Sequence, residues 1–179
     1  MPGVVPPHVL RTKLTPPRLH RRVLPRPALA ARLHEALDYR LTLVQAGTGY
    51  GKSTALASMA SMEAPLFWYS VSESDADPQI FLSHLIAAFS IRLSNFSDLP
   101  LALLQELGAQ GGNGALAQAL DALVNGLAAP GILNGPSLLV IDDYHFVAAS
   151  PEINTLTERF ITYLPPDLHL VISSRHPLT

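Results

Sequence analysis

The sequence predicts a three-layer α/β fold in which a mostly parallel sheet lies between two layers of helices. Apolar runs of strand length occur at 41–46, 66–71, 137–142 and 168–173. Segments with the helical spacing of apolar residues separate these runs, and this alternation is typical of parallel sheets. The run 137–142 is apolar at the consecutive positions 138–141, which is expected of a central strand covered on both faces.

The helices are predicted from their start signals. Proline suits the first turn of a helix because the amide hydrogen that it lacks would be unpaired there, and Asp, Asn or Ser can cap the free amides. A helix is therefore expected from Pro27, and others after Asp77, Asn113 and Ser150. The glycine-rich segment 108–114 is expected to be a turn.

Length and composition favour one globular domain. The 179 residues are 48% hydrophobic and 15% charged, and the net charge of −2 argues against wholesale nucleic-acid binding. The chain has no cysteine and its seven histidines lack metal-ligand spacing, so neither a disulfide framework nor a zinc site is predicted. No apolar stretch reaches about 18 residues and no secretory signal is seen, so we expect a cytoplasmic protein without a membrane span.

A glycine-rich segment follows the first predicted strand and precedes a helical pattern. Residues 46–54 match a phosphate-binding loop (Walker A), with Ala46 in place of the usual glycine, and the strand–loop–helix context supports the match. Glycines let backbone amides approach a polyphosphate, Lys52 supplies a positive charge, and the Ser53 hydroxyl can ligate Mg²⁺. The candidate nucleotide-binding residues of the loop are Ala46, Gly47, Thr48, Gly49, Tyr50, Gly51, Lys52, Ser53 and Thr54.

Two acidic residues end the third predicted strand. Ligands of open parallel sheets bind at the carboxyl ends of the strands. Asp142 (Walker B) is therefore predicted to hold Mg²⁺ opposite Ser53, and Asp143 to orient or deprotonate the attacking water. Arg175, at the tip of the fourth strand, is predicted to act with Lys52 on the terminal phosphate, the alternative being an exposed loop arginine.

Three other residues each allow two interpretations. Trp68 and Tyr69 could form a platform on which a nucleobase stacks, but aromatic residues in a strand more often belong to the core, which we favour. His145 is either a hydrogen-bond partner near the acidic pair or a loop histidine, and the second interpretation is favoured.

Residues 1–26 are predicted to form an extended arm, and residues 27–179 the nucleotide-binding domain. Seven of the sixteen prolines lie in the first 27 residues, so this segment is expected to be non-helical. The net charge is +6 over residues 1–40 and −8 over residues 41–179. The arm could contact DNA or a membrane surface, but packing on the acidic body or near the nucleotide phosphates is favoured.

Together these motifs resemble the N-terminal ATPase domain of the MalT-like, large LuxR-type transcriptional regulators, which belong to the STAND class of P-loop NTPases. The similar segments are 13–17 and 23–27 in the arm, the phosphate loop, 68–81, 139–145 and 164–175. Thr48 departs from the family's usual proline, with little expected consequence.

The resemblance implies an ASCE-type fold that binds ATP or ADP with Mg²⁺, with Val23 and Arg26 near the base or ribose. ATP would gate self-association of a longer regulator that contacts DNA through a C-terminal domain. A fifth strand is expected after Arg175, so the chain resembles a C-terminally truncated module with weak or absent ATPase activity of its own.

Two alternatives stay open. A P-loop small-molecule kinase usually has a basic lid, and residues 96–136 contain neither Arg nor Lys. A nucleotide-binding interaction domain without turnover would not need the set of Lys52, Ser53, Asp142 and Asp143. We therefore favour an ATP-binding and ATP-hydrolysing signal-transduction module.

Overall fold

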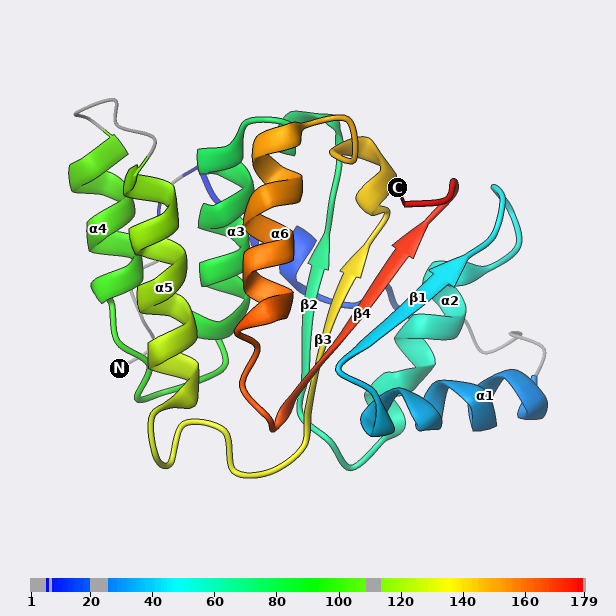
Figure 1. Cartoon of the computed structure of the whole chain (residues 1–179). Coiled ribbons are helices and arrows are strands. Elements are labelled where there is room, and N and C mark those ends of the chain that lie inside the picture. Colours follow the sequence, from blue (N-terminus) through cyan, green and yellow to red (C-terminus); the bar gives the residue numbers. More distant parts are fainter. Residues whose placement is uncertain (1–5, 7, 20–25, 109–113, 179) are drawn as a thin grey trace.

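The computed structural model describes residues 6, 8–19, 26–108 and 114–178, and it has the predicted three layers (Figure 1). The described strands form one parallel sheet in the order β1-β4-β3-β2. They are β1 (Leu41–Gln45), β2 (Leu66–Ser70), β3 (Ser137–Asp142) and β4 (Leu168–Ser174). Each begins and ends within one residue of its predicted bounds, so the α/β fold class and its four strands are confirmed.

The strand order brings two distant loops to one edge of the sheet. β4 lies between β1 and β3, with Val44 paired to Ser173 and Ile141 paired to Ile172. Because the strands are parallel, the carboxyl ends of all three meet at the same edge. The glycine-rich loop after β1 and the acidic pair at the end of β3 are therefore separated only by the width of β4.

Helices cover both faces of the sheet (Figure 1). α1 and α2 pack on one face, α3, α5 and α6 pack on the other, and α4 packs outside against α5. The helices are α1 (Pro27–His34), α2 (Lys52–Ala57), α3 (Pro78–Ser90), α4 (Leu99–Gly108), α5 (Gly114–Ala128) and α6 (Pro151–Thr162). Short 3₁₀ helices are η1 (Arg11–Leu14), η2 (Glu35–Asp38), η3 (Ser58–Ser61), η4 (Glu73–Asp75) and η5 (Tyr144–Phe146).

The predicted start signals act as caps. The Asp77 carboxylate accepts the amide hydrogens of Gln79 (2.8 Å) and Ile80 (3.1 Å), and the Ser150 hydroxyl accepts that of Ile153 (3.4 Å). α4 was not predicted, and most of the predicted turn at 108–114, with the Asn113 cap, lies outside the described residues.

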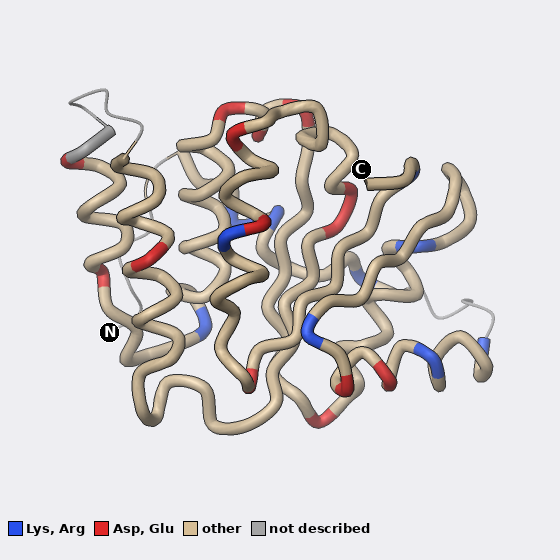
Figure 2. Tube along the Cα trace, in the orientation of Figure 1, with Lys and Arg blue, Asp and Glu red and all other residues tan. Residues whose placement is uncertain are grey.

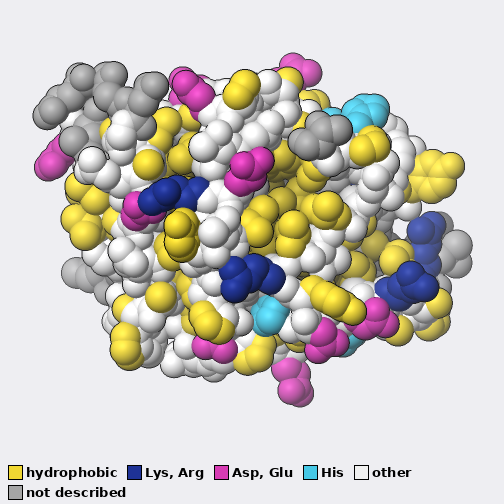
Figure 3. Space-filling view, viewed as in Figure 1, with side chains coloured by type: hydrophobic (Ala, Val, Ile, Leu, Met, Phe, Trp, Pro, Cys, Tyr) yellow, Lys and Arg dark blue, Asp and Glu magenta, His cyan; other side chains and the backbone are white. Residues whose placement is uncertain are grey.

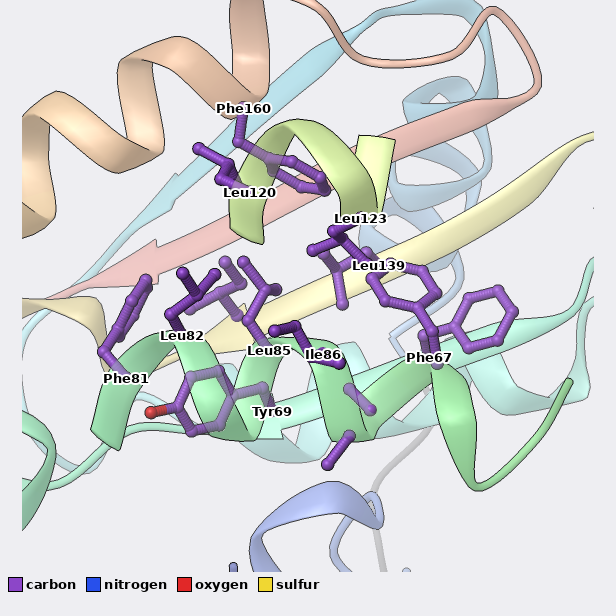
Figure 4. Packing of buried hydrophobic residues seen from close by; sticks show 14 of the residues in the cluster. Phe67, Tyr69, Phe81, Leu82, Leu85, Ile86, Leu120, Leu123, Leu139 and Phe160 are labelled. Carbon is purple, nitrogen blue, oxygen red and sulfur yellow. The ribbon is translucent and has the colours of Figure 1, made fainter. Parts of the chain in front are cut away.

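The core consists of two clusters, one on each face of the sheet. Alternate strand residues contribute to opposite clusters, so Phe67 and Tyr69 pack under α3 while Trp68 packs under α2. Figure 4 shows the first cluster, in which side chains of β2, α3, α5 and α6 interlock. Trp68 and Tyr69 are both 0% exposed, which leaves no ring face for a base. The core interpretation is confirmed, and the stacking platform is wrong.

The described part of the N-terminal arm packs on the body of the protein. Val9 and Leu14 are buried in the cluster under α3. η1 forms one turn of 3₁₀ helix, so the expectation that the arm contains no helix is wrong there. The segment from His8 to Thr15 contains no proline, which leaves room for a single turn.

The surface is uneven in charge and polarity. Basic segments gather around α1 and the start of β1, whereas α4 and α5 carry none (Figure 2). On the face drawn in Figure 3, apolar side chains gather between α6 and β1. Leu41, Leu43 and Ile161 line a shallow groove there.

Within the described ranges, no helix combines the length and apolarity that crossing a bilayer would require.

Candidate functional site

The glycine-rich loop joins β1 to α2 at the carboxyl edge of the sheet. It begins by extending the ladder, since the Ala46 amide donates to the Ser174 carbonyl at 3.3 Å. Gly49 and Gly51 have φ angles of +81° and +77°, a left-handed conformation that is strained for other residues. A Cβ on Gly47 would lie 3.5 Å from the Tyr50 ring, which is ordinary contact. Glycine is thus required by the backbone at two of the three positions.

Lys52 is the first residue of α2 and is only 9% exposed. Its ammonium donates to the carbonyl oxygens of Ala46 (2.7 Å) and Gly47 (3.1 Å). Among the residues that the structure describes, no carboxylate lies within 4.0 Å of this ammonium. A buried cation that is held only by neutral carbonyls leaves an ammonium hydrogen and a full positive charge for an anion.

The acidic pair at the end of β3 is organised by Ser173 of β4. The Ser173 hydroxyl donates to the carboxylate of Asp142 and accepts the backbone amide of Asp143 at 2.9 Å. Asp142 is 3% exposed, whereas the Asp143 side chain is 29% exposed. The two carboxylates therefore have different environments, one buried and fixed, the other open to solvent.

Asp143 has a φ of 59°. Among the described residues, it is the only non-glycine residue with a positive φ. Aspartate tolerates this left-handed conformation better than most residues, at a cost of about 1–2 kcal/mol. The conformation turns the chain sharply at the end of β3 and starts η5 directly after it. Strained residues of this kind gather at functional sites.

Arg175 and His145 lie beside the acidic pair. The His145 ring contacts Phe146 with centroids 4.3 Å apart, and the Arg175 guanidinium lies 5.5 Å from the centroid of that phenyl ring. The Nδ1 atom of His145 is 3.7 Å from an Asp143 carboxylate oxygen. Arg175 thus packs against η5 near Asp143.

Charged groups from both loops affect the protonation of His145. Burial lowers the pKa of His145 and the nearby Asp143 carboxylate opposes that effect, while Arg175 and Lys52 add to it. Both ring nitrogens are buried without a hydrogen-bond partner in the part of the chain that the structure describes. Lys52 and Asp143 therefore both influence this imidazole, as expected of the neighbouring carboxyl ends of β1, β4 and β3.

The remaining predicted site residues lie as follows. Ser53 and Thr54 are half-buried in the first turn of α2, and Thr48 and Tyr50 are exposed at the loop. Arg26 donates from its guanidinium to the Tyr50 carbonyl at 3.2 Å, which places it at the loop. Val23 lies outside the described residues.

Sequence reasoning missed the role of Ser173. The prediction includes this residue only as the last position of the fourth strand, although a serine directly after the apolar run of 170–172 could have indicated a polar partner on the neighbouring strand. Its pairing with Asp142 depends on the β3–β4 register, which the sequence alone does not give.

The chain is similar to curated transcriptional regulators. It is 32% identical over 167 residues to the HTH-type transcriptional regulator MalT of Yersinia pestis (strain Pestoides F), and 32% identical over 168 residues to that of Yersinia enterocolitica. Each alignment covers 93% of this chain, and the chain spans 18% of the length of each relative. No protein-family model matches the chain. The resemblance inferred from the motifs is confirmed.

Proposed function

We propose that this chain, related to the MalT-type transcriptional regulators over 93% of its length, is the ATP-binding module of a longer regulator of that type. It binds ATP or ADP with Mg²⁺, hydrolyses ATP slowly, and uses the nucleotide state to control self-association. One observation carries the proposal. The buried Lys52 ammonium, which has no described carboxylate partner, and the buried Asp142 carboxylate lie at one edge of the sheet.

The loop fits a polyphosphate in shape and charge. Gly49 and Gly51 hold the loop in conformations that other residues resist, and Lys52 already has its ammonium desolvated beside the loop carbonyls. An arriving phosphate oxygen would take the remaining ammonium hydrogen without a salt bridge having to break first. A charge-assisted hydrogen bond of this kind contributes about 1.5–3 kcal/mol.

The side-chain oxygens of Asp142 and Ser53 are of the kind that bind Mg²⁺. Mg²⁺ prefers carboxylate and hydroxyl oxygens together with phosphate oxygens, and when bound it would neutralise charge on the phosphates. Ser173 holds the Asp142 carboxylate in a fixed orientation through its hydroxyl. Asp142 can therefore receive a cation without first losing side-chain freedom.

Asp143 and Arg175 fit the roles of base and phosphate sensor. The Asp143 carboxylate is partly open to solvent, as a group that orients a water molecule must be, and its backbone amide is tied to Ser173. Arg175 follows β4 directly and packs on Phe146, beside the acidic pair. A terminal phosphate would draw the guanidinium toward itself.

Calorimetric titration with MgATP tests the proposal. Lys52→Ala should weaken binding about 10- to 100-fold, the equivalent of one charge-assisted hydrogen bond. Arg32→Ala is the matched control, because it removes a positive charge from the exposed surface of α1 and should leave the affinity unchanged. Equal affinities of Lys52→Ala and the unmodified chain would reject the proposed site.

Phosphate release separates this function from the alternatives. A regulatory ATPase releases phosphate at a rate that small hydroxyl or carboxyl acceptors do not change. Acceptor-dependent consumption of ATP would favour a kinase, and binding with no release by the longer regulator would favour an interaction domain.

A further inference from the structure

Residues 9–14, which we call the strap, lie against β2 at the edge of the sheet. The strap includes η1, which contacts both β2 and α3 (Figure 1, blue segment beside β2). Val9 and Leu14, at its two ends, are 6% and 2% exposed. The strap thus covers the outer side of β2, which is an edge strand among the described strands.

The first polar anchor of the strap is Lys13. Its ammonium donates to both carboxylate oxygens of Asp75, at 2.6 and 2.8 Å, and to the Ser72 hydroxyl at 2.7 Å. Asp75 is 0% exposed and also accepts the Ser72 amide at 2.7 Å. This ion pair fastens the strap to the connection between β2 and α3.

The second polar anchor is His84 of α3, which is 2% exposed. Its Nε2 atom lies 3.2 Å from the Leu10 amide nitrogen, and its Nδ1 atom lies 3.0 Å from the Ile80 carbonyl oxygen. An amide can only donate and a carbonyl can only accept, so Nδ1 carries the proton and Nε2 carries a lone pair. The docked strap therefore requires a neutral imidazole with one particular tautomer.

We propose that the strap is a pH-sensitive latch that opens when His84 is protonated at Nε2. A proton taken from solvent occupies the lone pair that accepts the Leu10 amide, so that amide is left facing a second donor. The bond to Leu10 is lost, and the docking equilibrium of residues 9–14 on β2 and α3 shifts toward the undocked state. The latch is inferred from these contacts alone, and it does not require that the chain binds a nucleotide.

Burial, Lys13 and His8 oppose the protonation of His84 while the strap is docked. Asp75 on η4 is 3.5 Å from Nδ1, but Lys13 already neutralises it, and the Tyr69 ring of β2 stacks on the imidazole with centroids 5.4 Å apart. Burial lowers the pKa of His84; the Ile80 carbonyl and Asp75 oppose this, whereas Lys13 and His8 add to it.

The direction of the pH dependence follows from this lowered pKa. In the undocked state His84 regains solvent and its pKa returns toward the ordinary histidine value of about 6.5. Docking is therefore strongest above that value and weakens as the pH falls below it. From about pH 7.5 to about pH 5.5 the docking equilibrium should weaken about tenfold at most.

Thiol accessibility measures the latch directly, because the chain has no cysteine of its own. Val9→Cys places one thiol under the docked strap, and Arg11→Cys places one on its exposed side. The ratio of their maleimide reaction rates cancels the intrinsic pH dependence of a thiol. This ratio should rise several-fold toward about pH 5.5, up to the tenfold limit. A ratio that stays flat would overturn the latch.

Two further variants assign the response to His84. In His84→Gln, the amide oxygen still accepts a hydrogen bond but does not titrate, so the ratio should lose its pH dependence. In His8→Asn, the pH dependence should persist. The proposal would be contradicted if the ratio kept the same pH dependence in His84→Gln as in the chain with His84. It would also be contradicted if the pH dependence disappeared in His8→Asn.

Trp68, the only tryptophan, is buried in the other core cluster and reports on global unfolding. Its emission should stay constant over this pH range. A change that runs parallel to the accessibility ratio would mean that the whole chain unfolds and would also overturn the latch.

Discussion

Replacing Ser173 with alanine should destabilise the protein and should also leave Asp142 and Asp143 less firmly held. Ser173 is 0% exposed, and its hydroxyl makes two bonds, one to the Asp142 carboxylate and one from the Asp143 amide. A hydrogen bond to a charged group contributes about 1.5–3 kcal/mol and one to a neutral amide about 1 kcal/mol. Because both partners stay buried or half-buried without the hydroxyl, we expect a loss of about 2–4 kcal/mol in the free energy of unfolding.

Urea denaturation measures this loss. With a denaturant slope of about 2 kcal/mol per M, the midpoint should fall by about 1–2 M. Ser174→Ala is the matched control, because this neighbouring serine is 3% exposed and, among the described residues, its hydroxyl bonds only to backbone atoms of His176. If both variants lower the midpoint equally, Ser173 has no special part in holding Asp142 and Asp143, and the reasoning fails.

Two other substitutions follow from the geometry of the loop and of Asp143. Gly51→Ala should lower the free energy of unfolding by about 1–2 kcal/mol, because alanine resists a φ of +77°, whereas Gly47→Ala, which is not in that conformation, should cost less in the same urea experiment. Asp143→Asn should keep its affinity for ATP but lose phosphate release in the longer regulator, and unchanged release would remove Asp143 from the mechanism.

Local patterns were sufficient to predict most of the fold. β3 is buried on both faces and is apolar at the consecutive positions 138–141, so it could be recognised from sequence alone. The helices after Asp77 and Ser150 begin where their caps predict. α4 was missed even though Ser97 accepts the Leu99 amide at 3.1 Å near its start. This helix packs on α5 and not on the sheet.

Contacts between distant segments could not be predicted in the same way. Lys13 meets Asp75 across 62 positions, and Ser173 meets Asp142 across 31. Such pairs depend on strand order and register, which composition and periodicity do not encode. The glycine-rich loop could be recognised because its residues are consecutive, whereas the contacts of Ser173 and of the strap became visible only in three dimensions.

The magnesium dependence of ATP affinity tests most directly whether the loop and Asp142 serve one ligand. Calorimetry with and without Mg²⁺ should show that Mg²⁺ strengthens ATP binding to the unmodified chain, and that Asp142→Asn loses most of this gain. Asp167→Asn, an exposed change before β4 at the opposite edge of the sheet, should keep it. An equal gain from Mg²⁺ in Asp142→Asn and in the unmodified chain would contradict the account.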